Sequence, residues 1–211
     1  MIRLHFIVEG QTEEAFVRDV LGPHLWVFQV VSAVRSVGGI TRHQKLKNDL
    51  LRWMREDRNA DARFTSMVDL YGLPRDFPGR ETAERIADPF ERVRVLEESF
   101  ATDIADRRFI PYIQLHEFEA LLFSNPDGFA VRFSERAALI QKLHAIRSQF
   151  PSPEHIDDGS DTAASKRILT VFPDYDKVTV GPLVVNHIGI EAVRRECRHF
   201  HDWVSRLEEL R

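Results

Sequence analysis

The 211-residue sequence contains one cysteine, Cys197. An internal disulfide is therefore impossible, and the disulfide-rich secreted class is excluded. No apolar run approaches the roughly 18 residues of a membrane span, and the amino terminus has no apolar run followed by a small-residue cleavage site. We therefore expect a cytoplasmic protein that does not interact with membranes.

The sequence also lacks an excess of positive charge. It has 29 basic and 33 acidic residues, with a formal net charge of −4. Any contact with nucleic acid must therefore come from a local patch. The chain has no G-x-x-x-x-G-K-[ST] phosphate loop, no G-x-G-x-x-G turn, no G-x-S-x-G elbow and no internal repeats. These absences exclude the usual nucleotide-binding and serine-hydrolase signatures.

Apolar runs alternate with amphipathic segments along the chain, which predicts βαβ units and a mainly parallel α/β sheet of four or more strands. We expect residues 1–125 to form the α/β core and residues 126–211 to form a helical extension packed on it. The expected strands are 2–8, 26–37, 63–70 and 109–115. The expected helices are 12–20 (ending before Gly22-Pro23), 41–58, 89–106, 134–150, 161–171 and 190–210; 151–159 is expected to be a linker or mobile loop, and 173–181 has no assigned structure.

Three of the expected strands end at carboxylates. Glu9 and Asp69 follow the first and third strands, and Glu117 and Glu119 follow the fourth. Parallel strands align their carboxyl ends at one edge, where α/β folds bind ligands. Close carboxylates repel one another unless a cation lies among them, and oxygen ligands suit Mg²⁺ or Mn²⁺. The pattern predicts a metal site of Glu9, Asp69 and one or both of Glu117 and Glu119. A surface Glu before a turn is the alternative interpretation of Glu9.

Basic residues offer candidates for contacts with phosphate. The polar side of helix 41–58 carries an excess of Arg and Lys, which fits either a phosphate-facing surface or an ordinary solvated face. Lys166, Arg167 and Lys177 follow later in the chain. The loop 72–79 contains two prolines and two glycines, and we expect it to be rigid and functional rather than a plain connector.

Several segments together carry a family resemblance. They are Val-Glu-Gly-Gln-Thr-Glu at 8–13, Val-Asp-Leu-Tyr-Gly-Leu-Pro at 68–74, Asp-Phe-Pro-Gly at 76–79, and Gln-Leu-His-Glu-Phe-Glu-Ala-Leu-Leu-Phe at 114–123. They resemble a bacterial Toprim-like family of unknown function, the domain-of-unknown-function 4276 group. This group is distantly similar to the Toprim domain of overcoming-lysogenization-defect nucleases. The resemblance implies a Toprim-like Rossmannoid fold and covers nearly the whole chain.

The resemblance implies roles for individual residues. Glu9 matches the Toprim glutamate, a metal ligand or general acid/base, and Asp69 matches the first aspartate of the Toprim Asp-x-Asp. Tyr71 stands where the second aspartate would be, so Glu119 or Glu117 would supply the missing carboxylate. We assign catalysis to Glu9, Asp69, Glu119 and Lys166, and substrate contacts to Gly10, Thr12, Tyr71, Arg167 and Lys177. Packing against the 74–78 loop is the favoured role of the Tyr71 ring.

Two functions follow from the resemblance. The first is a Mg²⁺-dependent nuclease that hydrolyses DNA or RNA. It would be the effector of a bacterial anti-phage system that works with an ABC- or AAA-type ATPase encoded nearby. The second is a non-catalytic Toprim-like adaptor or sensor subunit of such an ATPase complex. Tyr71 and the acidic net charge favour the second function, whereas three acid-bearing strand ends favour the first. The sequence leaves a homodimer open.

Overall fold

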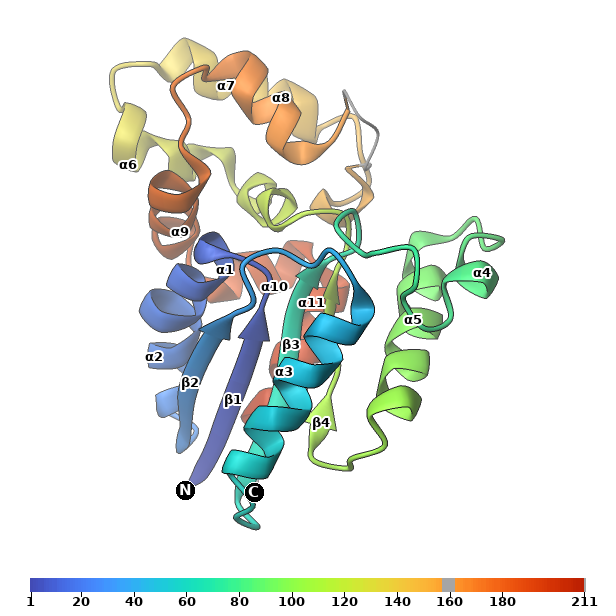
Figure 1. Cartoon of the computed structure of the whole chain (residues 1–211). Coiled ribbons are helices and arrows are strands. Elements are labelled where there is room, and N and C mark those ends of the chain that lie inside the picture. Colours follow the sequence, from blue (N-terminus) through green and yellow to red (C-terminus); the bar gives the residue numbers. More distant parts are fainter. Residues whose placement is uncertain (157–161, 211) are drawn as a thin grey trace.

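The computed structural model describes residues 1–156 and 162–210, and its centre is a parallel sheet (Figure 1). Five strands of this part of the chain have the order β2-β1-β3-β4, with β5 also beside β3. They are β1 (Ile2–Val8), β2 (Val30–Ser36), β3 (Ala62–Asp69), β4 (Phe109–Ile110) and β5 (Ile113–Gln114). Every strand pair is parallel, so the carboxyl ends meet at one edge. The expected parallel α/β fold is confirmed.

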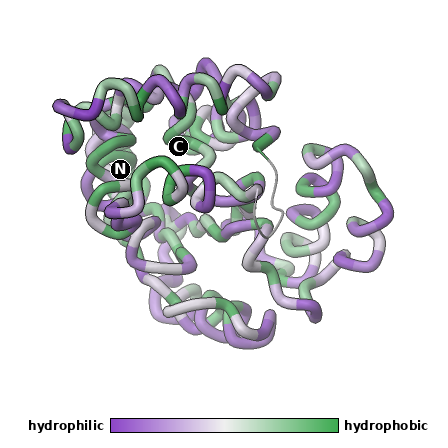
Figure 2. The backbone as a smooth tube through the Cα atoms, turned by 90° about the horizontal axis from the view of Figure 1, so that it is seen from above, coloured by the Kyte–Doolittle hydropathy of each residue, from purple (hydrophilic) through white to green (hydrophobic). Residues whose placement is uncertain are grey.

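Helices cover both faces of the sheet and its carboxyl edge (Figure 1). They are α1 (Gln11–Phe16), a π-helical turn (Val17–Leu21), α2 (Gly22–Trp26), α3 (His43–Glu56), α4 (Arg80–Ala83), α5 (Pro89–Ile104), α6 (Ala130–Phe133), α7 (Ala137–Arg147), α8 (Ala164–Val171), α9 (Lys177–Ile188), α10 (Ile190–Glu196) and α11 (Arg198–Glu208), with 3-10 segments at Phe118–Ser124, Pro126–Phe129 and Pro153–His155. In Figure 2 hydrophobic and hydrophilic stretches alternate along the helices, as expected for helices that bury one side.

The central strand β1 is buried on both faces, which explains its continuous apolar run. Leu4, Phe6 and Val8 belong to a core shared with α1 and the carboxy-terminal helices. Ile7 points to the other face and joins a second core with α3 and α5. The first core takes residues from both sides of the expected 125/126 boundary. None of the described helices is long and apolar enough to cross a membrane.

The first helical region differs from the prediction. It does not end before Gly22-Pro23 but continues to Trp26, so β2 starts at Val30 rather than at Trp26. The π-helical turn already interrupts the regular hydrogen-bond pattern, which lets Pro23 occupy the first turn of α2. A Cβ at Gly22 would lie 2.4 Å from Ser32 Oγ, so glycine permits this close packing on β2.

The expected strand 109–115 is divided, because Pro111 lacks the N–H that a continuous ladder needs. Residues 177–188, which were mostly unassigned, form α9, and the Asp176 side chain caps its start by accepting from Thr179 N at 2.8 Å. The expected helix 134–150 is shorter, at 137–147. Helix 161–171 begins at Ala164. Residues 151–156 of the expected linker contain the 3-10 turn Pro153–His155, and residues 157–161 lie outside the described residues.

The expected single helix 190–210 is two helices that meet at the buried Cys197. Glu154 stabilises the break, because its carboxylate accepts from the backbone N–H groups of His199 and Phe200, both at 3.0 Å. These two donors belong to the first turn of α11 and have no partner within the helix. A carboxylate from 45 residues away thus decides where the second helix starts.

Candidate functional site

Glu9 lies at the carboxyl end of β1, beside the end of β3. Its Oε2 accepts from the backbone N–H of Asp69 at 3.4 Å, so the two strand ends meet through this side chain. A Cβ at Gly72 would lie 2.8 and 2.9 Å from the two carboxylate oxygens of Glu9. Glycine at position 72 therefore leaves the space that this carboxylate occupies. Burial raises the pKa of Glu9 above its usual value.

Asp69 ends β3 and connects this strand to the segment that carries the later glutamates. Its Oδ1 accepts from the backbone N–H of Phe118 at 3.1 Å. Burial raises the pKa of Asp69 well above its usual value, and repulsion by Glu13, Glu9, Glu119 and Glu117 raises it further. Asp69 is therefore the centre of a cluster of carboxylates, to which we refer below as the carboxylate cluster (Glu9, Glu13, Asp69, Glu117 and Glu119).

Glu119 is the most deeply buried of the expected ligands, with 2 % of its surface exposed. Its Oε1 has no hydrogen-bond partner among the described residues. Burial raises its pKa to about 7; the charge of Lys177 acts in the opposite direction, and repulsion by Glu117 adds to the rise. A buried carboxylate oxygen without a donor is costly, and it points to a cation, proton or ligand that would satisfy it.

Tyr175, which the sequence did not single out, lies close to Glu119. Its hydroxyl is buried and also lacks a hydrogen-bond partner in the described part of the chain. Burial raises the pKa of Tyr175 well above its usual value, and the charge of Glu119 is the next largest cause. A Cβ at Gly181 would lie 3.1 Å from this hydroxyl, so α9 approaches it through a glycine. A side-chain hydrogen bond to Glu119 also contributes to the rise in the pKa of Tyr175, so the hydroxyl and the carboxylate are neighbouring groups that could pair with each other, although neither the hydroxyl nor Glu119 Oε1 has a well-formed hydrogen bond among the described residues.

Glu13, which the sequence did not single out as a site residue, joins the cluster from α1. It is 5 % exposed, and its Oε2 accepts from the backbone N–H of Gly10 at 2.9 Å. Gly10 is therefore the N-cap and the helix begins at Gln11, not at the expected Thr12. Thr12 is 3 % exposed, and its methyl group would lie 3.5 Å from a Cβ at Gly181, so it faces α9. The sequence signal for Glu13 is its position three residues after Gly10, where an acidic side chain can accept from the backbone N–H of the N-cap residue.

Lys177 is the cation of the site. It is the first residue of α9, and Figure 1 shows α9 beside α1 at the carboxyl edge of the sheet. Burial alone would lower its pKa, but the charges of Glu119, Glu13, Asp69 and Glu117 raise it overall. The charge of Lys177 in turn offsets part of the rise in the pKa values of Glu9, Glu13 and Glu119. The structure therefore brings one of the three expected basic residues to the carboxylates.

The other two basic candidates are placed differently. Lys166 is exposed on α8. Arg167 donates from Nε to the backbone oxygen of Thr162 at 2.6 Å, and its guanidinium carbon lies 5.0 Å from the centre of the Phe150 ring. These contacts engage the Arg167 guanidinium within the protein, and the substrate contact expected from the sequence stays a prediction.

Glu117 reaches the cluster, but its oxygens are already engaged. They accept from the backbone N–H of Ser165 at 3.0 Å and from its hydroxyl at 3.1 Å. Glu117 therefore ties the 3-10 segment to the start of α8. Glu119 keeps a free oxygen, which makes it the better third ligand of the two that the sequence left open.

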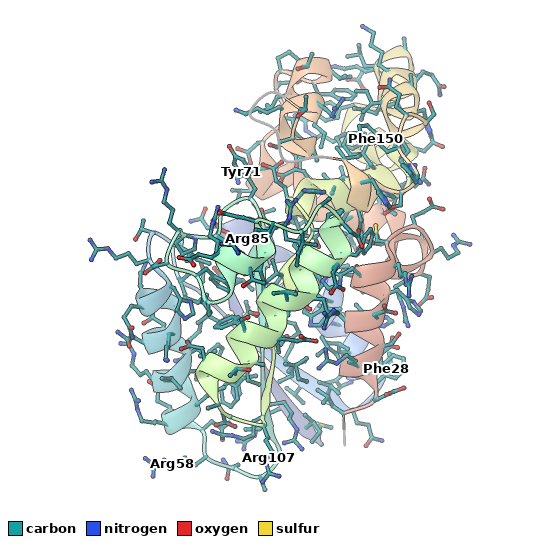
Figure 3. All side chains as sticks on the ribbon, turned by 90° about the vertical axis from the view of Figure 1, so that its right-hand side faces the viewer. Phe28, Arg58, Tyr71, Arg85, Arg107 and Phe150 are labelled. Carbon is teal, nitrogen blue, oxygen red and sulfur yellow. The ribbon has the colours of Figure 1, made fainter. Side chains whose placement is uncertain are left out.

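More than half of the Tyr71 surface, 54 %, is exposed, so packing against the 74–78 loop is not the main role of its ring. Its backbone N–H donates to the oxygen of His116 at 3.1 Å, which fixes the main chain while the ring reaches solvent. Figure 3 shows the ring on the upper part of the molecule, toward the carboxyl edge.

The carboxylates of the cluster fit a hard divalent cation, because their oxygens are hard ligands and Glu119 Oε1 has no hydrogen-bond partner among the described residues. Within residues 1–156 and 162–210, however, no three His, Cys, Asp or Glu side chains are grouped closely enough to hold a metal ion as placed. Binding would require a side chain of the cluster to turn toward the others. Such a movement alone would increase the repulsion that raises the pKa of Asp69, and a cation bound among the carboxylates would offset it.

Three comparisons relate the chain to known proteins. The family model described as "Domain of unknown function (DUF4276)" matches residues 8–208. No curated protein matches the chain. The C-terminal region of the Burkholderia pseudomallei OLD protein is 16 % identical, covering 95 % of this chain and 98 % of that chain, with a TM-score of 0.44. The C-terminal region of the Xanthomonas campestris pv. campestris OLD protein is 17 % identical, covering 97 % of each chain, with a TM-score of 0.38. Both scores are low and indicate loose superposition.

Proposed function

This chain belongs to the DUF4276 family, and we propose that it is a metal-dependent nuclease that hydrolyses phosphodiester bonds of DNA or RNA. The observation that carries the proposal is the carboxylate cluster itself. Five acids from three separate parts of the chain meet at the carboxyl edge of the sheet, and their mutual repulsion raises the pKa of Asp69. A fold tolerates such repulsion where a positively charged partner completes the site. The motif resemblance of residues 8–13 and 68–74 to Toprim domains supports the same function.

The carboxylates define what the site would bind. Glu9, Asp69 and Glu119 would hold Mg²⁺ or Mn²⁺, because their oxygens suit a hard cation and Glu119 Oε1 has no other partner. When bound, the cation would activate water and stabilise the negative charge on the scissile phosphate. Glu13 and Glu117 would help to position the ligands, because Glu13 accepts a hydrogen bond from the backbone N–H of Gly10 and Glu117 accepts one from the backbone N–H of Ser165.

Lys177 would act on the phosphate. Its charge lies close enough to Glu119, Glu13 and Asp69 to be perturbed by all three. Its ammonium is therefore held where a phosphate bound at the cluster would also meet it. A cation in this position stabilises negative charge that develops on the phosphate oxygens.

The decisive experiment compares Glu9→Gln with Glu14→Gln. Both replace a glutamate by its neutral isostere, but Glu14 lies on α1 outside the carboxylate cluster. With Mn²⁺ and labelled DNA and RNA, Glu9→Gln is expected to lower the cleavage rate by about 100-fold or more. Glu14→Gln is expected to cleave as the unmodified protein does. Full cleavage by Glu9→Gln, with an unchanged melting curve, would rule out this site.

We further propose that the protein is the effector of an anti-phage system and works with an ABC- or AAA-type ATPase. The support is the motif resemblance, together with the lack of a nucleotide-binding motif in the sequence. Purification of the tagged protein after expression from its native operon is expected to bring the ATPase with it. A tagged protein that purifies alone and gives full anti-phage protection alone would contradict this partnership.

A non-catalytic adaptor for such an ATPase is the second candidate. Two observations favour it: the described side chains include no ready group of three metal ligands, and Tyr71 replaces the second Toprim aspartate. In that case Glu9→Gln would leave anti-phage protection and ATPase binding unchanged. The nuclease proposal requires the same variant to lose protection while it still binds the ATPase.

A further inference from the structure

The loop after β3 (residues 70–79, called the shelf) lies beside the carboxylate cluster and is held in place by several contacts. Asp76 Oδ1 accepts from the backbone N–H of His43 at 3.0 Å, which fastens the loop to the start of α3. The Phe77 ring lies 5.0 Å from the His43 ring and 5.1 Å from the Phe100 ring of α5. Arg80 donates to the backbone oxygens of Leu73 and Pro74. The loop backbone is therefore held by contacts with α3, with α5 and with Arg80.

Tyr71 is the aromatic group that this shelf presents. It is two residues after Asp69, and 54 % of its surface is exposed although the backbone N–H groups of residues 70–72 are all hydrogen-bonded. Leu70 N donates to Gln114 O at 3.0 Å, Tyr71 N to His116 O at 3.1 Å, and Gly72 N to Asp69 O at 3.1 Å. A large ring held in solvent by a rigid backbone has no role in packing, and its open face is available to a flat partner.

Two exposed arginines lie where this loop meets the start of α3. Arg42 precedes His43 and Arg75 precedes Asp76, so the His43–Asp76 hydrogen bond brings them together from positions 33 residues apart. Both are exposed, and neither forms an ion pair within the described residues. By contrast, Lys45 is bonded to the backbone oxygens of Val37 and Gly39, and Lys47 pairs with Asp103. Arg42 and Arg75 are therefore free to meet an anion.

We propose that Tyr71, Arg42 and Arg75 form a binding surface for single-stranded nucleic acid, with a base stacked on the tyrosine and phosphates held by the arginines. The inference rests on the proposed function and adds its substrate class. An exposed ring can stack on the face of a base only where that base is unpaired, whereas paired bases present their edges in the grooves. The shelf starts two residues from Asp69, so a strand held there would pass beside the carboxylate cluster.

The test measures binding without cleavage. A fluorescein-labelled 12-nucleotide strand, as DNA and as RNA, and a blunt duplex of the same sequence are titrated with protein in EDTA, and anisotropy is recorded. The single strand is expected to bind at least about tenfold more tightly than the duplex. Tyr71→Ala is expected to weaken single-strand binding by about 5- to 100-fold, and Tyr71→Phe to keep it, because stacking needs the ring and not the hydroxyl.

The arginines are tested through the salt dependence of binding. Arg42→Ala and Arg75→Ala are each expected to reduce the slope of log K against log salt by about 0.7, the value for one phosphate contact on a single strand. Arg107→Ala is the control, since Arg107 is exposed near the opposite end of the molecule (Figure 3) and is expected to leave the slope unchanged.

Three results would overturn the inference: no single-strand binding, duplex binding as tight as single-strand binding, or unchanged binding by Tyr71→Ala. Failure of the proposed function gives a different result. In that case the unmodified protein would bind the single strand through Tyr71, and neither it nor Glu9→Gln would cleave the strand with Mn²⁺.

Discussion

Glu119→Gln is expected to change the pH dependence of stability in a defined direction. Burial raises the pKa of Glu119 from the reference value of 4.5 to about 7. Between these pH values the folded protein keeps a proton that the unfolded chain has lost, so stability falls as pH rises. The shift of roughly 2.5 units, at about 1.36 kcal/mol per unit, corresponds to a loss of about 3 kcal/mol by pH 8. Glutamine has no charge to bury, and the variant should not lose this stability.

The measurement is urea unfolding in EDTA at half-unit steps from pH 4.5 to pH 8. The variant and the unmodified protein should differ least at pH 4.5, and the variant should gain up to about 3 kcal/mol relative to the unmodified protein by pH 8. Glu117→Gln is the matched control. It weakens the two bonds from Ser165 and should cost about 1 to 3 kcal/mol at pH 8, the opposite sign. A stability difference for Glu119→Gln that stays constant with pH would refute the reasoning.

Two further variants test how the cluster is held. Gly72→Ala places a methyl group within 3 Å of both Glu9 oxygens (2.8 and 2.9 Å). Cleavage is therefore expected to fall by at least about tenfold while the circular dichroism spectrum stays native. Unchanged cleavage would show that the position of Glu9 does not matter. Lys177→Met removes the cation that lowers the pKa values of Glu9, Glu13 and Glu119. Cleavage should fall by about 100-fold, and the pH midpoint of the Glu119-dependent loss of stability should move to higher pH. A midpoint that does not move would contradict the placement of Lys177.

Local patterns were sufficient to predict the carboxylate edge. Buried strands carry continuous apolar runs, and a parallel sheet aligns their ends, so the meeting of Glu9 with the end of β3 follows from periodicity and topology alone. Helices α3 and α5 lie within the expected ranges 41–58 and 89–106, whereas the short α4 was not expected and the π-helical turn carries the first helical region past Gly22.

Contacts between distant residues decide the rest. Glu117 and Glu119 are alike in sequence, and only Ser165, 48 residues later, engages one of them. Lys177 and Lys166 are likewise indistinguishable until α9 is placed beside α1. The break at Cys197 depends on Glu154. No local pattern reports such contacts, because each is a single polar interaction between segments whose own propensities are neutral.

Calorimetric titration with Mn²⁺ tests the metal site most directly. The unmodified protein is expected to bind Mn²⁺, and binding is expected to release a proton below about pH 7 and less as the pH rises further, because Glu119 has a pKa of about 7 and a ligand must be deprotonated. Titration in two buffers of different ionisation enthalpy measures this release. Asp69→Asn is expected to abolish binding, and Glu14→Gln to leave it intact. Absence of Mn²⁺ binding at millimolar concentration, or equal binding by Asp69→Asn, would contradict the metal site and the nuclease function proposed from it.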